Sequence, residues 1–386
     1  MKYSIWVPTI LTAITVCGCT STKSPNLSID KNQAKIKLQI PEIKENEPWH
    51  YSDVFSKVEF ITLEATPTSM VGNIQNMEIT PNKDYIVFDR ENRKVARFDS
   101  TGHFLNTIGE CGHGASEYIN PSSISYDKYN DQLAVFDSNN KAIMFYSLDG
   151  EYANQIKLDR YFSDFCILDK DHIVIFFDYF SQNTGYNYWI IDREGKPLSK
   201  FEQIAEENLL KAFPSTQGTF TNENSNLLCR SHFSDIVYRV VGTDVEPYIH
   251  ITDPSGNFDI GDPKDVANFT QRDNSISFLA QIKKTIFINI SKGCYVYTWA
   301  VTPEKSFIGL SPDNDLSEIS LIGQLLNSDG QNVYYAVSPE SAEISYDCLV
   351  KNATYKNATI DEKVAEQFMR FSANKNPIIQ ICTVKE

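Results

Sequence analysis

The stretch Tyr85-Ile86-Val87-Phe88-Asp89 recurs 48 residues later as Leu133-Ala134-Val135-Phe136-Asp137. In each copy an apolar strand ends in an aspartate, a polar turn follows, and a second strand runs to a glycine, Gly102 or Gly150. Asp, Asn, Ser and Gly suit such turns because they bond to nearby backbone or accept positive φ. The same offset relates Val95 to Ile143, Phe98 to Tyr146, Phe104 to Tyr152 and Ile108 to Ile156.

Looser copies of this unit follow. Residues 172–176 and 188–195 give a third copy, whose Gly195 comes 45 residues after Gly150. Weaker copies lie at 227–240, 294–299 and 332–337. Repeats of roughly 40 to 50 residues made of short strands are typical of propeller blades, since one blade cannot bury both faces alone. We therefore predict an all-β propeller with four-stranded antiparallel blades; a β-sandwich with similar hairpins is the alternative.

The two ends of the repeat region predict how the ring closes. We expect residues 57–64 (KVEFITLE) to pair with residues 378–383 (IIQICT) and complete the last blade. Residues 201–213 and 364–371 carry short amphipathic patterns, which we interpret as helical insertions between strands.

The charge balance limits the partners of the chain. Its 386 residues include 35 basic and 50 acidic side chains, for a net charge of −15. Lys2 is the only charged residue among the first 18, so their removal would leave −16. An evenly acidic surface argues against nucleic acid and anionic lipid as direct partners. One large domain, residues 47–386, is compatible with this length.

The first 18 residues have the layout of a secretory signal peptide, with one lysine, an apolar stretch and a small-residue exit. The apolar stretch is shorter than the roughly 20 residues that span a membrane. Its exit, Val16-Cys17-Gly18-Cys19, resembles the lipobox of bacterial lipoproteins. That resemblance implies cleavage before Cys19 and lipidation of Cys19, which attaches the protein to a membrane. An ordinary cleaved signal with an incidental cysteine is the alternative.

The segment after Cys19 suggests how the domain is held. Residues 19–46 are polar and poor in aromatics, which predicts a flexible tether. Two or more acyl chains give lasting membrane attachment. No acidic run follows Cys19, and this favours a lipid-anchored protein of the cell envelope that faces the periplasm.

Six further cysteines have no C-x-x-C spacing, so zinc and thioredoxin-type sites lack support. Most stand in strand-like runs, which favours a role as buried small hydrophobic side chains. An oxidising compartment also permits disulfides, so their redox state stays open. These cysteines are Cys111, Cys166, Cys229, Cys294, Cys348 and Cys382.

Four segments carry a resemblance to a known family. They are residues 55–64 (FSKVEFITLE), residues 98–118, which end in GECGHGASEY, residues 233–240 (FSDIVYRV) and residues 374–379 (NKNPII). The chain resembles the six-bladed, NHL-like β-propeller lipoproteins of Bacteroidetes over roughly residues 50 to 386. That family commonly has Gly-x-Gly-Pro-Gly-Glu-Tyr where this chain has Ala115 and Ser116 in place of Pro and Gly. The resemblance implies six blades, where the repeats alone leave six or seven open, and implies little about activity because the family is mostly uncharacterised.

The most motif-like segment contains Gly112, Gly114, Glu117 and Tyr118. One interpretation places backbone amides and Glu117 at the mouth of the central pore to bind a ligand. The simpler interpretation is a tight loop between blades, in which the glycines supply backbone angles and Tyr118 packs over the next blade.

Metal and catalytic signals are sparse. The six histidines stand singly, without H-x-x-x-H or H-E-x-x-H, and no G-x-S-x-G elbow occurs. No metal-ligating or catalytic residue is therefore assigned. Asp89 and Asp137 sit at equivalent strand ends, where they would allow a ring of carboxylates for calcium, although capping of the turns explains them more simply.

These patterns predict a non-catalytic binding module. The predicted partners are the membrane, through the N-terminal lipid, and a glycan, a peptide or an envelope protein; no nucleic acid is expected. No cofactor is predicted apart from the calcium alternative. The alternative function is a metal-dependent hydrolase or lyase with its site in the axial funnel of the propeller.

Overall fold

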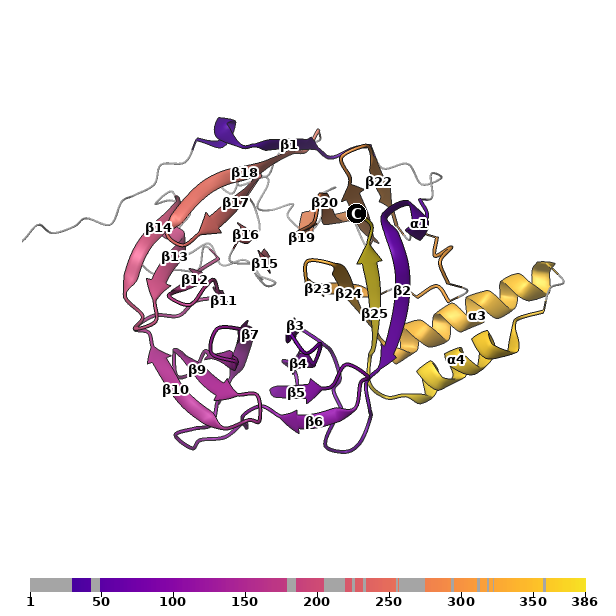
Figure 1. Cartoon of the computed structure of the whole chain (residues 1–386), viewed down its shortest axis with the longest axis horizontal. Coiled ribbons are helices and arrows are strands. Elements are labelled where there is room, and N and C mark those ends of the chain that lie inside the picture. Colours follow the sequence, from indigo (N-terminus) through magenta and orange to yellow (C-terminus); the bar gives the residue numbers. More distant parts are fainter. Residues whose placement is uncertain are drawn as a thin grey trace, which may run out of the picture.

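The computed structural model is a ring of six antiparallel four-stranded blades around a central axis (Figure 1). The prediction of a six-bladed all-β propeller is confirmed. The structure describes residues 30–42, 49–178, 185–204, 219–223, 226–231, 234–254, 256, 275–292, 295–310, 313–317, 319–321, 323–356 and 359–386. The signal peptide and Cys19 lie outside these residues.

The first three blades follow the chain in order, each from its innermost to its outermost strand. Blade 1 contains β3 (Asn76–Ile79), β4 (Tyr85–Asp89), β5 (Lys94–Phe98) and β6 (Phe104–Thr107). Blade 2 contains β7 (Pro121–Asp127), β8 (Gln132–Asp137), β9 (Ala142–Ser147) and β10 (Tyr152–Lys157). Blade 3 contains β11 (Asp164–Ile167), β12 (His172–Phe176), β13 (Tyr186–Asp192) and β14 (Pro197–Gln203).

Among the last three blades, blades 4 and 6 include a strand from the N-terminal part of the chain, and blade 5 does not. Blade 4 contains β15 (Thr219–Glu223), β16 (Asn226–Arg230), β17 (Ile236–Val241) and β18 (Asp244–Thr252), with β1 (Ile36–Gln39) on its outer edge. Blade 5 contains β19 (Ser275–Ile282), β20 (Thr285–Lys292), β21 (Tyr295–Val301) and β22 (Ser306–Gly309). Blade 6 contains β23 (Gln324–Ser328), β24 (Asn332–Val337), β25 (Ile378–Val384) and β2 (Phe55–Thr62).

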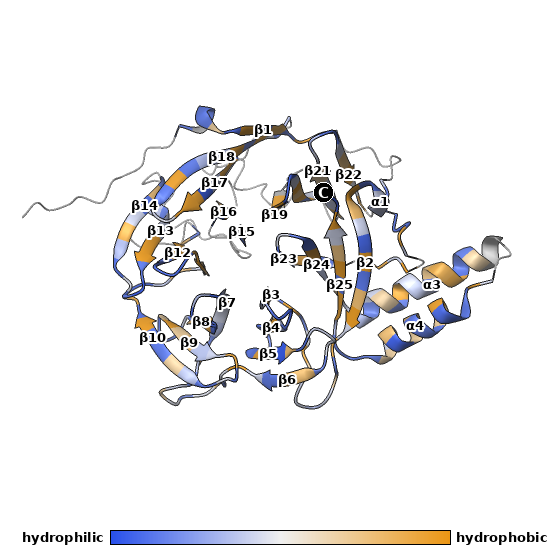
Figure 2. Ribbon diagram, in the orientation of Figure 1, coloured by the Kyte–Doolittle hydropathy of each residue, from blue (hydrophilic) through white to orange (hydrophobic). Residues whose placement is uncertain are grey.

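The continuous apolar runs of the middle strands are explained by packing on both faces of each blade. Along β8, Leu133 and Val135 lie in the core shared with blade 1, whereas Ala134 and Phe136 lie in the core shared with blade 3. Successive side chains of a strand point to opposite faces, so a strand between two neighbours must be apolar throughout. On the outer strands apolar and polar segments alternate, as β18 shows in Figure 2.

The ring closes by joining the two ends of the chain in blade 6. Strand β2 pairs antiparallel with β25, with Val58 opposite Cys382 and Ile61 opposite Ile379. The prediction that residues 57–64 and 378–383 meet is confirmed. Closure therefore completes blade 6, which packs against blade 5 on one face and blade 1 on the other.

Part of the predicted tether, residues 19–46, is folded. Residues 31–33 form a short 3-10 helix, η1 (Lys31–Gln33), and β1 pairs parallel with β18, placing Ile36 opposite Ile249 and Leu38 opposite Ile251. Ile36 and Leu38 pack against the core between blades 4 and 5. The alternation Ile-Lys-Leu-Gln is that of an edge strand with one buried face, so the tether prediction is wrong for these residues.

A helical hairpin interrupts blade 6 between β24 and β25 and projects from the side of the ring (Figure 1). It comprises α3 (Pro339–Lys356) and α4 (Glu362–Ala373); a short α1 (Tyr51–Val54) precedes β2. The helix predicted at 364–371 lies within α4, where Phe368 and Phe371 are buried. The helix predicted at 201–213 is wrong for residues 201–203, which belong to β14, and its part beyond Ile204 lies outside the described residues.

The described helices include none with the length and apolar character needed to cross a membrane. Among the predicted buried cysteines, Cys166, Cys229 and Cys382 are buried, whereas Cys111 and Cys348 are exposed. All five are free thiols, and Cys294 lies outside the described residues.

Candidate functional site

The four predicted ligand residues lie together in the loop that connects β6 to β7. Glu117 turns back into this loop, where its Oε2 accepts a hydrogen bond of 2.7 Å from the Gly114 amide. Gly112 has no room for a side chain because the Glu117 carboxyl fills that space. Tyr118 is 1% exposed and packs edge-on against Tyr146 of blade 2. These contacts are those of a tight loop between blades, and ligand binding by these residues stays a prediction.

Asp89 and Asp137 are completely buried caps of equivalent turns. Asp89 Oδ2 accepts from the Gly72 amide at 2.6 Å and from the Asn92 side chain at 2.7 Å. Asp137 Oδ2 accepts from the Ile119 amide at 3.0 Å and from a neighbouring asparagine at 2.6 Å. This agrees with the capping interpretation. No group of three or more His, Cys, Asp or Glu side chains in the described ranges is placed to hold a metal ion.

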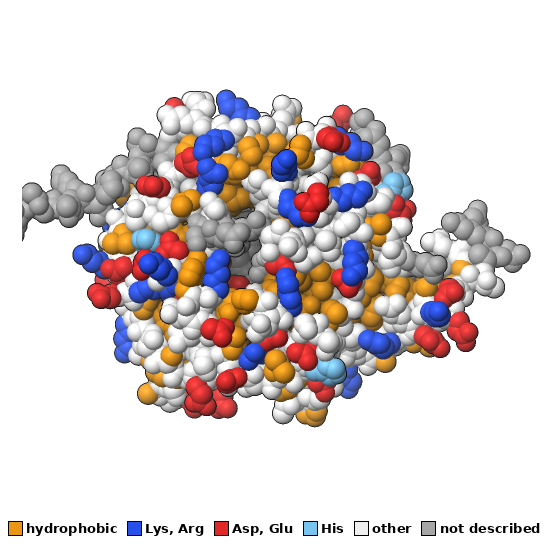
Figure 3. Space-filling view, viewed as in Figure 1, with side chains coloured by type: hydrophobic (Ala, Val, Ile, Leu, Met, Phe, Trp, Pro, Cys, Tyr) orange, Lys and Arg blue, Asp and Glu red, His pale blue; other side chains and the backbone are white. Residues whose placement is uncertain are grey.

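A cavity runs along the axis of the ring. It has a volume of about 940 Å³, and the innermost strands of all six blades contribute to its wall. One wall residue from each blade in turn is Glu78, Ser125, Cys166, Asn222, Phe278 and Leu325. The face of the molecule in Figure 3 is hollowed near its centre. This volume falls in the range of pockets for small molecules, about 300 to 1,000 Å³.

Side chains on the innermost strands bond to the backbone of neighbouring blades around this cavity. Side-chain amide or hydroxyl groups make these hydrogen bonds, which join neighbouring blades near the axis. The bonds run from Asn327 to Met77 O (2.6 Å), Asn76 to Ile124 O (3.4 Å), Ile167 N to Ser125 Oγ (3.0 Å), Asn222 to Ile167 O (2.7 Å) and Thr221 to Leu279 O (2.8 Å).

Two carboxyl groups face the cavity from blades 1 and 3. Burial, opposed by a hydrogen bond from the Tyr126 backbone and reinforced by the nearby Asp164, raises the pKa of Glu78 to about 8. Burial also raises the pKa of Asp164 to about 7, although hydrogen bonds from Ser123 and the Phe165 amide act in the opposite direction. Burial also raises the pKa of the nearby Cys166 thiol well above its usual value, and both carboxyls act in the same direction. Clustered groups with raised pKa values in a cavity are typical of functional sites.

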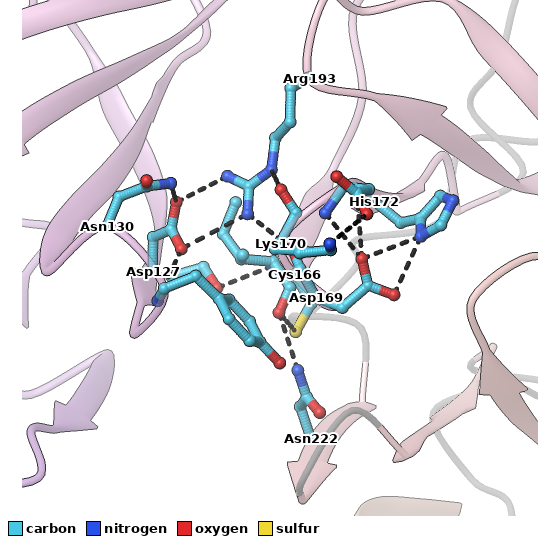
Figure 4. Close-up of polar contacts among 12 residues, drawn as sticks. Asp127, Asn130, Cys166, Asp169, Lys170, His172, Arg193 and Asn222 are labelled. Atoms are coloured by element: carbon cyan, nitrogen blue, oxygen red, sulfur yellow. Dashed lines mark hydrogen bonds and ion pairs between the residues drawn. The ribbon is translucent and has the colours of Figure 1, made fainter.

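A polar clamp between blades 2 and 3 supports the wall beside Cys166 and Asn222 (Figure 4). Arg193 Nη1 lies 2.6 Å from Oδ2 of the fully buried Asp127. The same guanidinium donates to Asp169 O at 2.6 Å and to Lys170 O at 3.0 Å. The clamp joins the ends of β7, β11 and β13, and it therefore fixes the inner strands that carry the cavity wall.

Comparisons with known proteins agree with this architecture. A family model described as "Domain of unknown function (DUF4934)" matches residues 34–383. A comparison with curated proteins finds no match.

Two solved structures are similar in fold. A Bacteroides fragilis protein named "Putative exported protein" superposes with a TM-score of 0.69 at 16% identity, covering 91% of this chain and 99% of its own. A member of the duf4221 family from Bacteroides vulgatus gives a TM-score of 0.54 at 9% identity, covering 86% of this chain and 97% of its own. At such identities the likeness shows the fold alone.

Proposed function

We propose that the chain, which belongs to the family described as "Domain of unknown function (DUF4934)", is a lipid-anchored binding module of the bacterial cell envelope that holds a ligand in its axial cavity. The observation that supports binding most strongly is the cavity of about 940 Å³, to which all six innermost strands contribute. A cavity lined by a few converging polar groups among apolar ones is the usual form of a ligand site.

The anchoring part of the proposal rests on the N-terminal sequence. The signal-like residues 1–18 and the lipobox-like Val16–Cys19 support export and lipidation at Cys19. The similar Bacteroides fragilis protein carries the word "exported" in its name, which agrees with an envelope location. Residues 20–23 (TSTK), directly after Cys19, contain no acidic side chain, which supports a periplasmic orientation.

Binding can be tested with variants that narrow the cavity mouth. Val296 lines the cavity and is 48% exposed, so Val296→Trp should obstruct the cavity without disturbing a core. Val241 is 46% exposed and lies away from the cavity wall, which makes Val241→Trp the matched control. We expect a panel of oligosaccharides, short peptides and amines to contain a ligand that raises the melting temperature of the wild type and of Val241→Trp but not of Val296→Trp. At 100 times its dissociation constant a ligand adds about 2.7 kcal/mol of stability.

Three outcomes would contradict the proposal. If no member of the panel stabilises the wild type, or if Val296→Trp responds like the control, the axial cavity is not the binding site. If the purified protein holds about one tightly bound metal per chain, the metal-dependent hydrolase or lyase becomes the better hypothesis; no finding favours it over binding.

The anchor has a separate test. Cys19→Ala should release the protein from the membrane fraction, because the acyl chains are the proposed attachment. Retention of the variant in the membrane fraction would refute lipidation as the anchor and leave the binding proposal untouched.

A further inference from the structure

The wall of the axial cavity carries two carboxyl groups that have no lysine or arginine partner among the described residues. Glu78 and Asp164 face the cavity from blades 1 and 3, and the opposite wall consists largely of amide and aromatic side chains such as Asn222, Phe220 and Phe278. Two lysines at the cavity, Lys83 and Lys128, have other contacts: Lys83 pairs with Asp329 at 2.6 Å, and Lys128 lies over the Tyr129 ring. In the part of the chain that the structure describes, neither carboxyl forms an ion pair with a lysine or arginine.

The hydrogen bonds of Asp164 involve only one of its two carboxyl oxygens. Asp164 is 5% exposed, and its Oδ1 accepts hydrogen bonds from the Ser123 hydroxyl and from the Phe165 amide at 2.8 Å. Its other oxygen, Oδ2, receives no hydrogen bond from any described residue. Glu78 has a backbone donor, Tyr126, and no side-chain donor among those residues. Both carboxyls therefore present acceptor oxygens to the cavity without a matching donor.

Given the proposed binding function, on which this step rests, we infer that the cavity takes an organic cation, a ligand with at least one primary ammonium group that Glu78 and Asp164 neutralise. An anion would meet two like charges. A neutral polyol could donate hydrogen bonds but would leave the two carboxyls, once ionised, without a counter-charge, which is costly. An ammonium group supplies both donors and the opposite charge, and the aromatic rings on the opposite wall suit its alkyl chain and its charge.

The inference predicts a direction for the pH dependence. A cation binds the ionised carboxyls, so its affinity should rise as Glu78 and Asp164 lose their protons between about pH 6 and pH 9. The groups that act on Glu78 are Asp164 and Cys166 on β11 and Tyr126 on β7, and those that act on Asp164 are Asp178 and Arg90. Lys83, Lys128 and Asp329 also line the cavity. An alkylammonium keeps its charge over this range, because its pKa lies near that of lysine, about 10.4.

Calorimetric titration with spermidine tests the inference, with a Gly-Lys-Gly peptide as a second source of the same ammonium chemistry. Triacetylspermidine is the control, because it keeps the chain and the N–H donors at its two ends but loses the charges. We expect spermidine or the peptide to bind the wild type at least about tenfold more tightly at pH 9 than at pH 6, and triacetylspermidine not to bind. Glu78→Gln should weaken binding at pH 9 by about tenfold or more and reduce its pH dependence. Asp164→Asn provides a second variant with the same expected direction.

The outcomes separate this inference from the binding function itself. Equal binding of triacetylspermidine, affinity that falls as pH rises, or unchanged binding by Glu78→Gln and Asp164→Asn would overturn the cationic ligand. If neither ammonium probe binds while an oligosaccharide binds in a Val296-dependent manner, the inference fails and the binding module stands. If no compound of any class binds, the proposed function fails.

Discussion

The first half of the ring comprises blades 1–3 and the second half blades 4–6. The two halves have the same architecture, but different structural features stabilise them. In the first half Gly102, Gly150 and Gly195 occupy the turn between the third and fourth strands with φ of +89°, +95° and +86°. A side chain at any of them would come within 3.0 Å of the preceding blade. In the second half Gly242 has its nearest neighbour at 4.0 Å, and the corresponding turn of blade 5, residues 302–305, has no glycine.

The second half compensates with contacts between distant segments. Strand β1 adds to blade 4, β2 and β25 close blade 6, and the α3–α4 hairpin packs against blade 6 through Phe368 and Phe371. The comparison indicates that blades can lack the glycine turns of the repeat where strands from distant parts of the chain pair with them. The two halves also differ in the cavity wall, since the first half supplies Glu78 and Asp164, which have no basic partner among the described residues, whereas Asp329 of the second half pairs with Lys83.

Removing the non-local closure should have the largest effect. Deletion of residues 375–386 removes β25 together with the buried Ile378, Ile379 and Cys382, and leaves β2 and β24 without their shared partner. We expect loss of cooperative unfolding, measured by thermal denaturation and calorimetry. Deletion of Lys385 and Glu386 alone, beyond β25, is the control and should change stability by less than about 1 kcal/mol. A single unchanged melting transition in the longer deletion would show that closure is dispensable.

A buried ion pair in the first half should matter far more than an exposed one in the second. Arg193→Ala leaves the fully buried Asp127 without its counter-charge and should cost about 3–5 kcal/mol in urea unfolding. The matched change is Arg239→Ala in blade 4, whose pairing with Glu246 is partly exposed and whose loss should cost less than about 1 kcal/mol. Similar losses in the two variants would mean that the clamp between blades 2 and 3 adds little stability.

Substitution of the repeat glycines tests how much the turns between the third and fourth strands contribute to stability. Gly150→Ala should cost about 2–4 kcal/mol, because it combines left-handed backbone strain with overlap of the new methyl group and Thr107 O, 2.7 Å away. Gly242→Ala has the strain without the overlap and should cost about 1–2 kcal/mol. Urea unfolding of both variants measures the difference. A cost for Gly242→Ala as large as for Gly150→Ala would show that close approach of the blades is not the reason for the glycine.

The difference between local turns and non-local pairing also explains which parts of the fold could be predicted from the sequence. The repeat around Tyr85–Asp89 reports local turns and strands, so it predicted the first blades, and the chain ends predicted closure because both read as strands. Strand β1 escaped prediction because its four residues pair with a segment more than 200 residues away. Helix α3 escaped because its polar and apolar residues are weakly segregated, whereas α4 has a clear apolar face.

The candidate site was harder to predict than the fold. Glu78 and Asp164 are single acidic residues in short strands, and no motif marks them. Their importance depends on which strand of each blade lies nearest the axis, a property of the closed ring. Placing the strand before each repeated YIVFD-like segment at the axis would have drawn attention to Glu78, which precedes Tyr85 by seven residues.

The smallest expected effect is the change in the free energy of unfolding that comes from protonation of Glu78 in the cavity wall. The folded protein raises the pKa of Glu78 to about 8, whereas a glutamate in an unfolded chain titrates near 4.3. Between these values the folded state retains a proton that the unfolded state releases, so the free energy of unfolding should fall as pH rises from about 5 to 8.

Glu78→Gln cannot lose this proton, and it should therefore reduce the fall by at least about 1 kcal/mol. Urea unfolding at pH 5 and pH 8 measures the fall in each protein. Glu151→Gln, at an exposed turn of blade 2, is the matched control and should behave like the wild type. If the wild type and Glu78→Gln lose equal stability between the two pH values, Glu78 is already ionised in the folded protein, and the wall near blades 1 and 3 carries more negative charge than the raised pKa implies.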